Sequence, residues 1–406
     1  MKRYHATTTR PMLSLSILTI LCTAWMLSCT AHHNTKKEMK ITWTKLTTNG
    51  LHGDLAKGVS AAYAALLRGQ LIVAGGANFP GKLGFEGGLK AYYNEIMLYD
   101  PTKKEWTLIG HLPDSSAYGV SVPVSGGALW IGGNSASQSL KSVYKISLSQ
   151  TGTAELEPFP EPPASMDNFA GCAIGDTAFI GGGNVNGNPA NTFYCMDAKT
   201  DSGWTALPDF PGLPRVQPVM AAIEQHNRKF VYLLGGFFGG DPENKPAMAS
   251  DVLRYDVTAR RWETAGCLAD DKTGNPFSLT GAAAMPVDNR YILCLGGVNH
   301  GIFLDAITAQ YNIAHNAAIT TDERKQQNLE FLRHYMTQPI EYYRFNPECR
   351  IFDTLTGEWK TIDVTPHTAR AGATLVFSGK EVYAIQGELK PGVRSPETWK
   401  GKISQK

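Results

Sequence analysis

Two residues near the end of the chain, Glu388 and Arg394, have side chains that could carry out chemistry together. They flank Pro391-Gly392, a dipeptide typical of turns, so the chain is expected to fold back and bring both side chains to one place. An arginine can hold a carboxylate through two parallel hydrogen bonds, and a glutamate can transfer protons. The pair therefore suits an acidic substrate, although a surface ion pair that only pins a loop would use the same residues.

An apolar strand that ends in a pair of glycines recurs along the chain and would position such side chains. The copies are Leu71–Gly76, Leu129–Gly133, Ala178–Gly182, Val231–Gly236 and Tyr291–Gly297, with a degenerate sixth copy at Val382–Gly387. A second signature alternates with it, an aromatic residue followed by aspartate and then by tryptophan. This signature occurs at Tyr99-Asp100 with Trp106, Tyr255-Asp256 with Trp262, and Phe352-Asp353 with Trp359. The alternation predicts one four-stranded antiparallel unit per repeat.

The composition favours an all-β chain. Of 406 residues, 43% are hydrophobic and 18% are charged, which is enough apolar mass for a large core. The 41 glycines and 23 prolines are too many for a helical bundle and suit short strands joined by tight turns. The net charge of +2 creates no long-range field that would recruit nucleic acid or a membrane surface.

The repeats resemble the kelch family of β-propellers, and six of them can be counted. The expected blades run over residues 58–108, 117–158, 168–207, 215–265, 277–362 and 370–403. The last blade is one strand short, and Ile41–Leu46 can supply that strand, with Trp43 at the tryptophan position of the repeat. The sequence therefore predicts a six-bladed kelch-type β-propeller over 41–406, closed by pairing the two ends of the chain so that no sheet edge stays free.

Loop lengths indicate which face of this fold carries function. The connections between first and second strands are tight, whereas those between second and third strands are long, above all 298–344. Ligand chemistry is expected on the face with the long loops. In the longest loop Thr320 and Glu323 form a capping box and Pro339 ends the pattern, which predicts a helical insertion in blade five at about 304–344. The insertion could be a lid over the site or could pack only on the outside.

Further candidates for substrate binding follow from their place on the same face. Arg215 and Arg370 precede the first strands of blades four and six and could add positive charge. Asn78 and Asn299 follow strand-two segments and could bond hydroxyl groups of a ligand, and Tyr118 precedes blade two. Each also has a structural interpretation, since asparagine after Gly-Gly is a common turn residue and arginine at a strand start often bridges neighbouring blades.

The amino terminus is expected to be a targeting segment. Lys2, Arg3 and Arg10 precede an apolar run over 12–27, the pattern of a secretory signal peptide over 1–29. The run ends Met26-Leu27-Ser28-Cys29, which resembles a bacterial lipobox, so Cys29 is the predicted lipidation site. Residues 30–40 are expected to be a polar tether, and the protein is expected to be periplasmic or anchored by lipid to the cell envelope.

No disulfide framework, metal site or cofactor is expected. Five cysteines remain after the signal peptide, an odd number that cannot all pair. The chain has no CxxC or HExxH motif and no close pair of ligands beyond His32-His33. Small buried strand residues are the expected role of the cysteines.

The segment Gly387 to Arg394, of the pattern GE-x-KPG-x-R, is similar to the active-site motif of bacterial N-acetylneuraminate epimerases, also called sialic acid mutarotases. Other segments of the chain also resemble that family, but they occur in a different order along the sequence. The chain therefore looks like a cyclically permuted branch of the family. The stretches are Phe210–Arg215, Gly296–Asn299 with Ile302-Phe303, and Ala117–Ser121. A closed ring tolerates such permutation because its ends meet in one blade.

The resemblance implies a reaction and assigns roles. The enzyme would interconvert the α and β anomers of N-acetylneuraminate by opening and closing the sugar ring, without a cofactor. Glu388 would move a proton and Arg394 would hold the substrate carboxylate. A non-catalytic kelch propeller that binds a glycan or a protein remains an alternative, because a fold alone does not fix a function. A sialidase has weak support, since only Asp201-Ser202-Gly203-Trp204 suggests its repeated motif, and a copper oxidase of kelch type is also open.

Overall fold

The repeated apolar segments form antiparallel strands throughout the part of the chain that the computed structural model describes, residues 39–200 and 202–405. Six four-stranded sheets hold most of them, and the sheets are numbered here by the order of their first strands. The first sheet comprises β2 (Tyr63–Leu67), β3 (Gln70–Ala74), β6 (Glu95–Asp100) and β7 (Glu105–His111). The second comprises β8 (Val120–Val124), β9 (Gly127–Ile131), β10 (Val143–Leu148) and β11 (Ala154–Phe159).

The next three sheets repeat this order. The third comprises β13 (Ala170–Ile174), β14 (Thr177–Gly181), β17 (Phe193–Asp197) and β18 (Thr205–Leu207). The fourth comprises β19 (Val219–Gln225), β20 (Arg228–Leu234), β23 (Asp251–Asp256) and β24 (Arg261–Cys267). The fifth comprises β25 (Ala282–Val287), β26 (Tyr291–Gly296), β27 (Glu348–Asp353) and β28 (Glu358–Val364).

The sixth sheet joins the two ends of the described chain. It comprises β29 (Thr374–Ser378), β30 (Glu381–Ile385), β33 (Thr398–Gln405) and β1 (Met39–Lys45). β1 pairs with β33 along its whole length, as the sequence predicts for the missing strand. The strand starts at Met39, whereas the tether was expected to reach residue 40, because the Met39 side chain is buried against the core.

In five of the six sheets a tryptophan ties the sheet to the preceding one, and the second sheet has no tryptophan on its fourth strand. The indole nitrogen donates to a backbone carbonyl in the chain before the sheet: Trp106 to Thr47, Trp204 to Pro160, Trp262 to Pro208 and Trp359 to Cys267. In the sixth sheet the indole of Trp43 donates to Asp363 of β28 at 3.2 Å. Trp43 therefore takes the expected position in the repeat.

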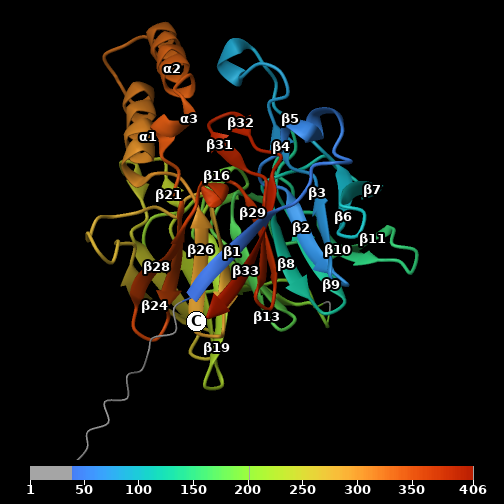
Figure 1. Ribbon diagram of the computed structural model, residues 1–406. Helices are drawn as coiled ribbons and strands as arrows, with labels where there is room; N and C mark the ends of the chain where they lie inside the picture. Colours follow the sequence, from blue (N-terminus) through green and yellow to red (C-terminus); the bar gives the residue numbers. More distant parts are fainter. Residues whose placement is uncertain (1–38, 201, 406) are drawn as a thin grey trace, which may run out of the picture. The chain divides into compact units, whose positions relative to one another are not determined.

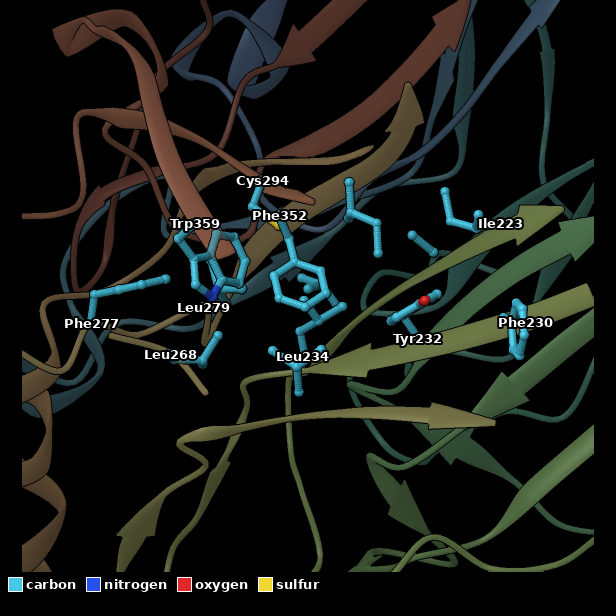
Figure 2. Packing of buried hydrophobic residues seen from close by; sticks show 14 residues of the cluster. Ile223, Phe230, Tyr232, Leu234, Leu268, Phe277, Leu279, Cys294, Phe352 and Trp359 are labelled. Atoms are coloured by element: carbon cyan, nitrogen blue, oxygen red, sulfur yellow. The ribbon is translucent and has the colours of Figure 1, made fainter. Parts of the chain in front are cut away.

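The core lies between neighbouring sheets. Figure 2 shows one of its clusters, in which the ring of Phe352 packs against Trp359 of the same sheet at a centroid distance of 5.0 Å. Tyr232 of the fourth sheet approaches Phe352 edge-on at 6.1 Å, so the cluster joins two sheets. The apolar side chains of each strand pack toward an adjacent sheet. Burial on both faces of a sheet explains why the repeated strand segments of the sequence are continuous apolar runs.

The first strands of the six sheets contact one another in a closed cycle: β2 with β8, β8 with β13, β13 with β19, β19 with β25, β25 with β29, and β29 with β2. Just before each of these strands lies a residue with a left-handed backbone. These residues are Ala61, Tyr118, Asn168, Gln217, Gly281 and Gly372.

Backbone hydrogen bonds link these six residues into a ring. Each amide donates to the carbonyl of the residue in the preceding sheet, from Tyr118 to Ala61 at 2.9 Å and onward until Ala61 donates to Gly372 at 2.7 Å. We refer to these six residues as the hydrogen-bonded ring. The cycle of sheets is consistent with the β-propeller that the repeats predict.

Helices and short strand pairs extend from one side of the sheets (Figure 1). Between β26 and β27 lie α1 (His300–Ala314), α2 (Thr321–Met336) and α3 (Ile340–Tyr343). The capping box of Thr320 and Glu323 begins α2, as the sequence predicts, whereas α1 begins before the expected residue 304. The short strands are β4 (Ala77–Asn78) with β5 (Ala91–Tyr92), β12 (Met166–Asp167) with β15 (Asn184–Val185) and β16 (Asn188–Pro189), β21 (Phe237–Phe238) with β22 (Ala247–Met248), and β31 (Glu388–Lys390) with β32 (Val393–Arg394).

Single turns of 3₁₀ helix lie at η1 (Gly53–Lys57), η2 (Gly84–Glu86) and η3 (Pro366–Thr368). The five cysteines in the described part of the chain are free. None of the helices between residues 39 and 405 has the length and apolar character needed to cross a bilayer. The predicted signal peptide, the lipidation site Cys29 and most of the tether lie outside the described residues.

Candidate functional site

Glu388 and Arg394 face each other across the hairpin of β31 and β32, as the turn at Pro391-Gly392 predicts. The two residues are register partners, and their side chains form an ion pair between Glu388 Oε1 and Arg394 Nη1. The same Oε1 accepts the backbone N–H of Gly392 at 2.8 Å. No hydrogen bond within the described residues involves Oε2, and the Glu388 side chain is 24% exposed. One carboxylate oxygen is therefore anchored while the other is open to a ligand.

The hairpin is fixed at both of its ends. The backbone of Glu388 exchanges two hydrogen bonds with Ala371, the neighbour of Gly372 in the hydrogen-bonded ring, at 2.7 and 3.0 Å. At the far end Lys390 Nζ donates to the carbonyls of Met336 and Gln338 at the end of α2, where a cation is favourable. The hairpin therefore connects the ring of sheets to the helices.

Arg394 is held in a buried position with part of its guanidinium unused. Its side chain is only 4% exposed, and Nε donates to Ser60 Oγ at 2.8 Å. The guanidinium lies 6.0 Å from the ring centre of Phe79. With Nε bonded to Ser60 and Nη1 to Glu388, Nη2 makes no hydrogen bond to the described residues. That nitrogen can donate to an incoming anion.

Tyr118 belongs to the same polar chain. Its hydroxyl lies 3.4 Å from Ser60 Oγ and accepts a hydrogen bond from Lys90 Nζ at 2.6 Å. The Lys90 ammonium also lies 4.0 Å from the centre of the Tyr118 ring. The structure thus brings together Glu388 and Arg394 of the β31–β32 hairpin, Ser60 just before the first sheet, and Tyr118 just before the second. Sequence reasoning did not find Ser60 or Lys90, because neither stands in a motif.

Two tyrosines of the helical segment lie near Glu388. Tyr335 of α2 and Tyr343 of α3 meet edge-on at a centroid distance of 5.4 Å. Burial, with added contributions from Tyr342 and from the negative charge of Glu388, raises the pKa of Tyr343 to about 12. The pKa of Tyr335 is raised for the same reasons. Both phenols are neutral at physiological pH, and the helices that carry them reach the site.

The two other predicted arginines do not converge on the Glu388–Arg394 pair. Arg215 is buried and forms an ion pair with Asp251 at 2.6 Å. Arg370 is buried and donates to the Glu397 carboxylate at 2.9 Å and to the carbonyls of Gln386 and Glu397. Burial lowers the pKa of both guanidiniums, and the carboxylate partners oppose that effect. Their contacts hold neighbouring segments together, the structural interpretation that the sequence left open.

The two predicted asparagines also have internal partners. Asn78 is buried, donates to the carbonyls of Asp54 and Gly58, and accepts from the Tyr93 hydroxyl at 2.7 Å. Asn299 is the N-cap of α1, where its side chain accepts the Ile302 N–H at 3.1 Å. Both side chains shape the loops around the site through these bonds.

A cavity of about 300 Å³ runs between the first strands of the six sheets. Its walls are mostly apolar, with many alanines, and it ends at the hydrogen-bonded ring. Tyr118 belongs to its lining, whereas Glu388 and Arg394 do not. A charged sugar would lose hydration in such a channel without gaining partners, so the polar groups beyond the ring are the better site.

Among residues 39–200 and 202–405, no group of three or more histidine, cysteine, aspartate or glutamate side chains is placed to hold a metal ion. The chemistry that the arrangement can perform with its own groups is acid–base transfer at Glu388 Oε2 beside a cationic anchor.

Comparisons with known proteins identify relatives of this chain. The family model of the N-acetylneuraminate epimerases matches residues 25–153 and 159–406. N-acetylneuraminate epimerase of Haemophilus influenzae (strain 86-028NP) is 30% identical over 258 residues, which cover 63% of this chain and 62% of the relative. N-acetylneuraminate epimerase 1 of Escherichia coli O6:H1 is 27% identical over 254 residues, 62% of each chain. The aligned part thus spans about 62% of the length of these curated relatives.

A solved structure shares the fold. The structure of YjhT is 26% identical to this chain and superposes with a TM-score of 0.50 over 61% of this chain and 67% of its own.

Proposed function

Because the chain belongs to the N-acetylneuraminate epimerase family, we propose that it interconverts the α and β anomers of N-acetylneuraminate by assisting opening and closure of the sugar ring. Relatives with that name align with only part of their length, so the proposal rests on the site as well as on the family. The observation that carries it is the Glu388–Arg394 pair, in which one carboxylate oxygen and one guanidinium nitrogen stay free for a ligand.

Arg394 anchors the substrate. N-Acetylneuraminate carries a carboxylate on its anomeric carbon, and Arg394 Nη2 can donate to it from a buried position where the charge is poorly screened. Lys390 on the hairpin bonds to the end of the helical segment, and Tyr343 of that segment lies near Glu388, so the helices border the place where the sugar would bind. This anchor keeps the anomeric carbon beside Glu388 while the rest of the ring opens.

Glu388 moves a proton. Ring opening needs one proton to leave the anomeric hydroxyl and one to reach the ring oxygen. Oε2 of Glu388 is free to take the first, while Oε1 stays fixed by Arg394 and by the Gly392 amide. A positioned acid–base group typically contributes about 10²–10⁴-fold in rate, which is enough to accelerate a reaction that is already spontaneous.

The finer fold is part of the proposal. The six sheets are the blades of a six-bladed kelch-type propeller, β1 closes the ring, and α1 to α3 are a helical insertion in the fifth blade. Support comes from the cycle of contacts between first strands, the hydrogen-bonded ring and the pairing of β1 with β33. A cyclically permuted order of the blades would explain why the relatives align with only part of this chain.

We further propose that the protein is exported, with residues 1–29 as a signal peptide, and is periplasmic or attached to the cell envelope through lipid on Cys29. The basic start, the apolar run and the lipobox-like end of the segment support this location.

The test is proton NMR of N-acetylneuraminate released as a single anomer, followed with and without the purified protein at catalytic concentration. Faster approach to the anomeric equilibrium is the expected result. An unchanged rate with measurable binding of the sugar would instead indicate a non-catalytic propeller.

A further inference from the structure

Anomer exchange needs two proton transfers at two different oxygens, and Glu388 can serve only one of them at a time. The second group must reach the ring oxygen while the sugar carboxylate is held by Arg394. Bulk water could supply that proton, but a positioned side chain would do so faster. A side chain that is joined to Arg394, carries a transferable proton and lies near a fixed cation would meet this need.

Tyr118 has these properties. Ser60 Oγ connects its hydroxyl to Arg394, with distances of 3.4 Å to Tyr118 and 2.8 Å to Nε. Lys90 donates to the Tyr118 oxygen at 2.6 Å, so the hydroxyl proton of Tyr118 is not used in that bond. When the proton leaves, the ammonium of Lys90 is already in place to stabilise the phenolate.

The backbone at Tyr118 is unusual for a large side chain. Its φ of 65° lies in the left-handed region, which aromatic residues rarely adopt. The hydrogen-bonded ring holds this conformation, because the Tyr118 amide donates to Ala61 and its carbonyl accepts from Asn168 at 2.8 Å. Two of the equivalent positions in the other sheets are glycine, which takes this conformation freely. Ala61, Asn168 and Gln217 take the same conformation in other sheets, so the ring itself fixes the backbone at Tyr118 and thereby holds the position of its side chain.

From this geometry we infer that Tyr118 is a second catalytic residue, the acid–base partner of Glu388, and that Lys90 and Ser60 are positioning residues for it. The inference rests on the proposed function. In ring opening the anomeric hydroxyl gives its proton to Glu388 as the bond between the anomeric carbon and the ring oxygen breaks. The bonding pair goes to the ring oxygen, which takes the proton of Tyr118, and the anomeric carbon becomes a ketone.

Closure on the other face restores both groups. The hydroxyl formed from the ring oxygen attacks the ketone and returns its proton to the Tyr118 phenolate. Glu388 returns its proton to the new anomeric oxygen. The cycle therefore needs no oxidant, reductant or co-reactant.

The experiment compares Tyr118→Phe, Lys90→Met and Tyr291→Phe with the unaltered protein, using the NMR anomer-exchange rate over a range of sugar concentrations. Tyr291 starts β26 and has no part in the site, so its variant is the matched control for losing a phenol hydroxyl. Tyr118→Phe should lower kcat on the order of 10²-fold with little change in KM, and Lys90→Met should lower kcat by a smaller factor. Melting temperatures of all four proteins report whether the fold is kept.

The outcomes separate this inference from the proposed function. If the unaltered protein does not accelerate anomer exchange, the proposed function fails. If it does and Tyr118→Phe keeps its kcat, or the loss lies wholly in KM, Tyr118 is not an acid–base residue. A folded Lys90→Met protein with unchanged kcat would overturn the role given to Lys90, whatever the stability of Tyr118→Phe.

Discussion

The two oxygens of the Glu388 carboxylate have different surroundings. Oε1 accepts from Arg394 and from the Gly392 amide, which fixes the orientation of the group. Oε2 is left open on a side chain that is about one quarter exposed. Ion pairs elsewhere in the structure use either pattern: Asp353 meets Arg290 through both oxygens, whereas Glu263 meets Arg254 through Oε1 alone. At Glu388 the one-oxygen pattern leaves Oε2 available for an acid–base role.

The substitution Glu388→Gln tests the acid–base role, because it replaces one carboxylate oxygen by an amide nitrogen. The amide keeps the size and one hydrogen-bond acceptor but cannot take a proton, so the anomer-exchange rate should fall about 10²–10⁴-fold, roughly 3–5 kcal/mol in barrier height. Glu381→Gln is the control, since Glu381 pairs with Lys400 in the same sheet, away from the hairpin. An unaltered exchange rate in the Glu388 variant would contradict the mechanism.

Glu397 makes the fold sensitive to acid. Burial raises its pKa, but hydrogen bonds from Lys45 and Trp399 and the charge of Arg370 outweigh burial, so the net pKa lies below the ordinary value of 4.5. A depressed pKa means that its contribution to stability is present above pH 4.5 and is lost as the pH falls toward the pKa of the folded state. The melting temperature of Glu397→Gln should lie below that of the unaltered protein at neutral pH, and the gap should narrow in acid. A gap that stays constant would argue against the linkage.

Sequence reasoning reached part of the site. The turn at Pro391-Gly392 predicted the meeting of Glu388 and Arg394, because both residues lie on one hairpin. Ser60 and Lys90 join them from distant segments, and nothing local in the sequence marks that contact. The N-cap role of Asn299 could have been found, since asparagine before a helical segment is a common start signal.

At the scale of elements, the glycine before Glu388 sets the direction of the hairpin. Gly387 has a φ of 102°, and a Cβ there would lie 2.9–3.0 Å from Ala373 atoms, including its backbone. Gly379 also has a positive φ, of 57°, but a Cβ there would meet nothing within 4 Å. At Gly379 only the left-handed backbone opposes a side chain, whereas at Gly387 a less accessible backbone conformation and a clash both oppose it.

Gly379→Ala should lower the free energy of unfolding by about 1–2 kcal/mol, the typical cost of a left-handed alanine. Gly387→Ala should cost more and should also slow anomer exchange, because relief of the clash moves Glu388. Chemical denaturation and the NMR rate measure both effects. Equal losses of stability in the two variants, with unaltered exchange, would show that the hairpin tolerates the extra methyl group.

The strand pattern predicted the sheets well because the repeated apolar segments are buried between neighbouring sheets. The start of α1 at His300, ahead of residue 304, depends on the Asn299 cap and on packing of Ile307 against Met248 and Tyr343, which no repeat encodes. A local cap and tertiary packing together thus determined the boundary that periodicity missed.

At the scale of the whole molecule, the ends of the chain share one sheet and one core. Ile41 of β1 is 3% exposed and packs in a cluster with residues of the fifth and sixth sheets, among them Leu293 and Val382. Closure therefore depends on side chains at the start of the described chain as well as on backbone pairing with β33.

Ile41→Ala should lower the free energy of unfolding by about 2–5 kcal/mol, the usual cost of truncating a buried isoleucine. Its neighbour Thr42 is exposed on the opposite face of the strand, so Thr42→Ala should change stability by less than about 0.5 kcal/mol. Denaturant titration of both variants measures the two free energies of unfolding. Similar small effects would mean that β1 adds little to the closed arrangement.

In the hydrogen-bonded ring, each of the six residues uses both its amide and its carbonyl within the cycle. The first amides of a helix have no partner within the helix and can bind an anion. The hydrogen-bonded ring is closed, so none of its six residues has an unpaired amide. The amides and carbonyls of the ring are therefore taken, and recognition of an anionic sugar falls to side chains such as Arg394. Substitution of those side chains could then change the ligand specificity without changing the backbone hydrogen bonds of the ring.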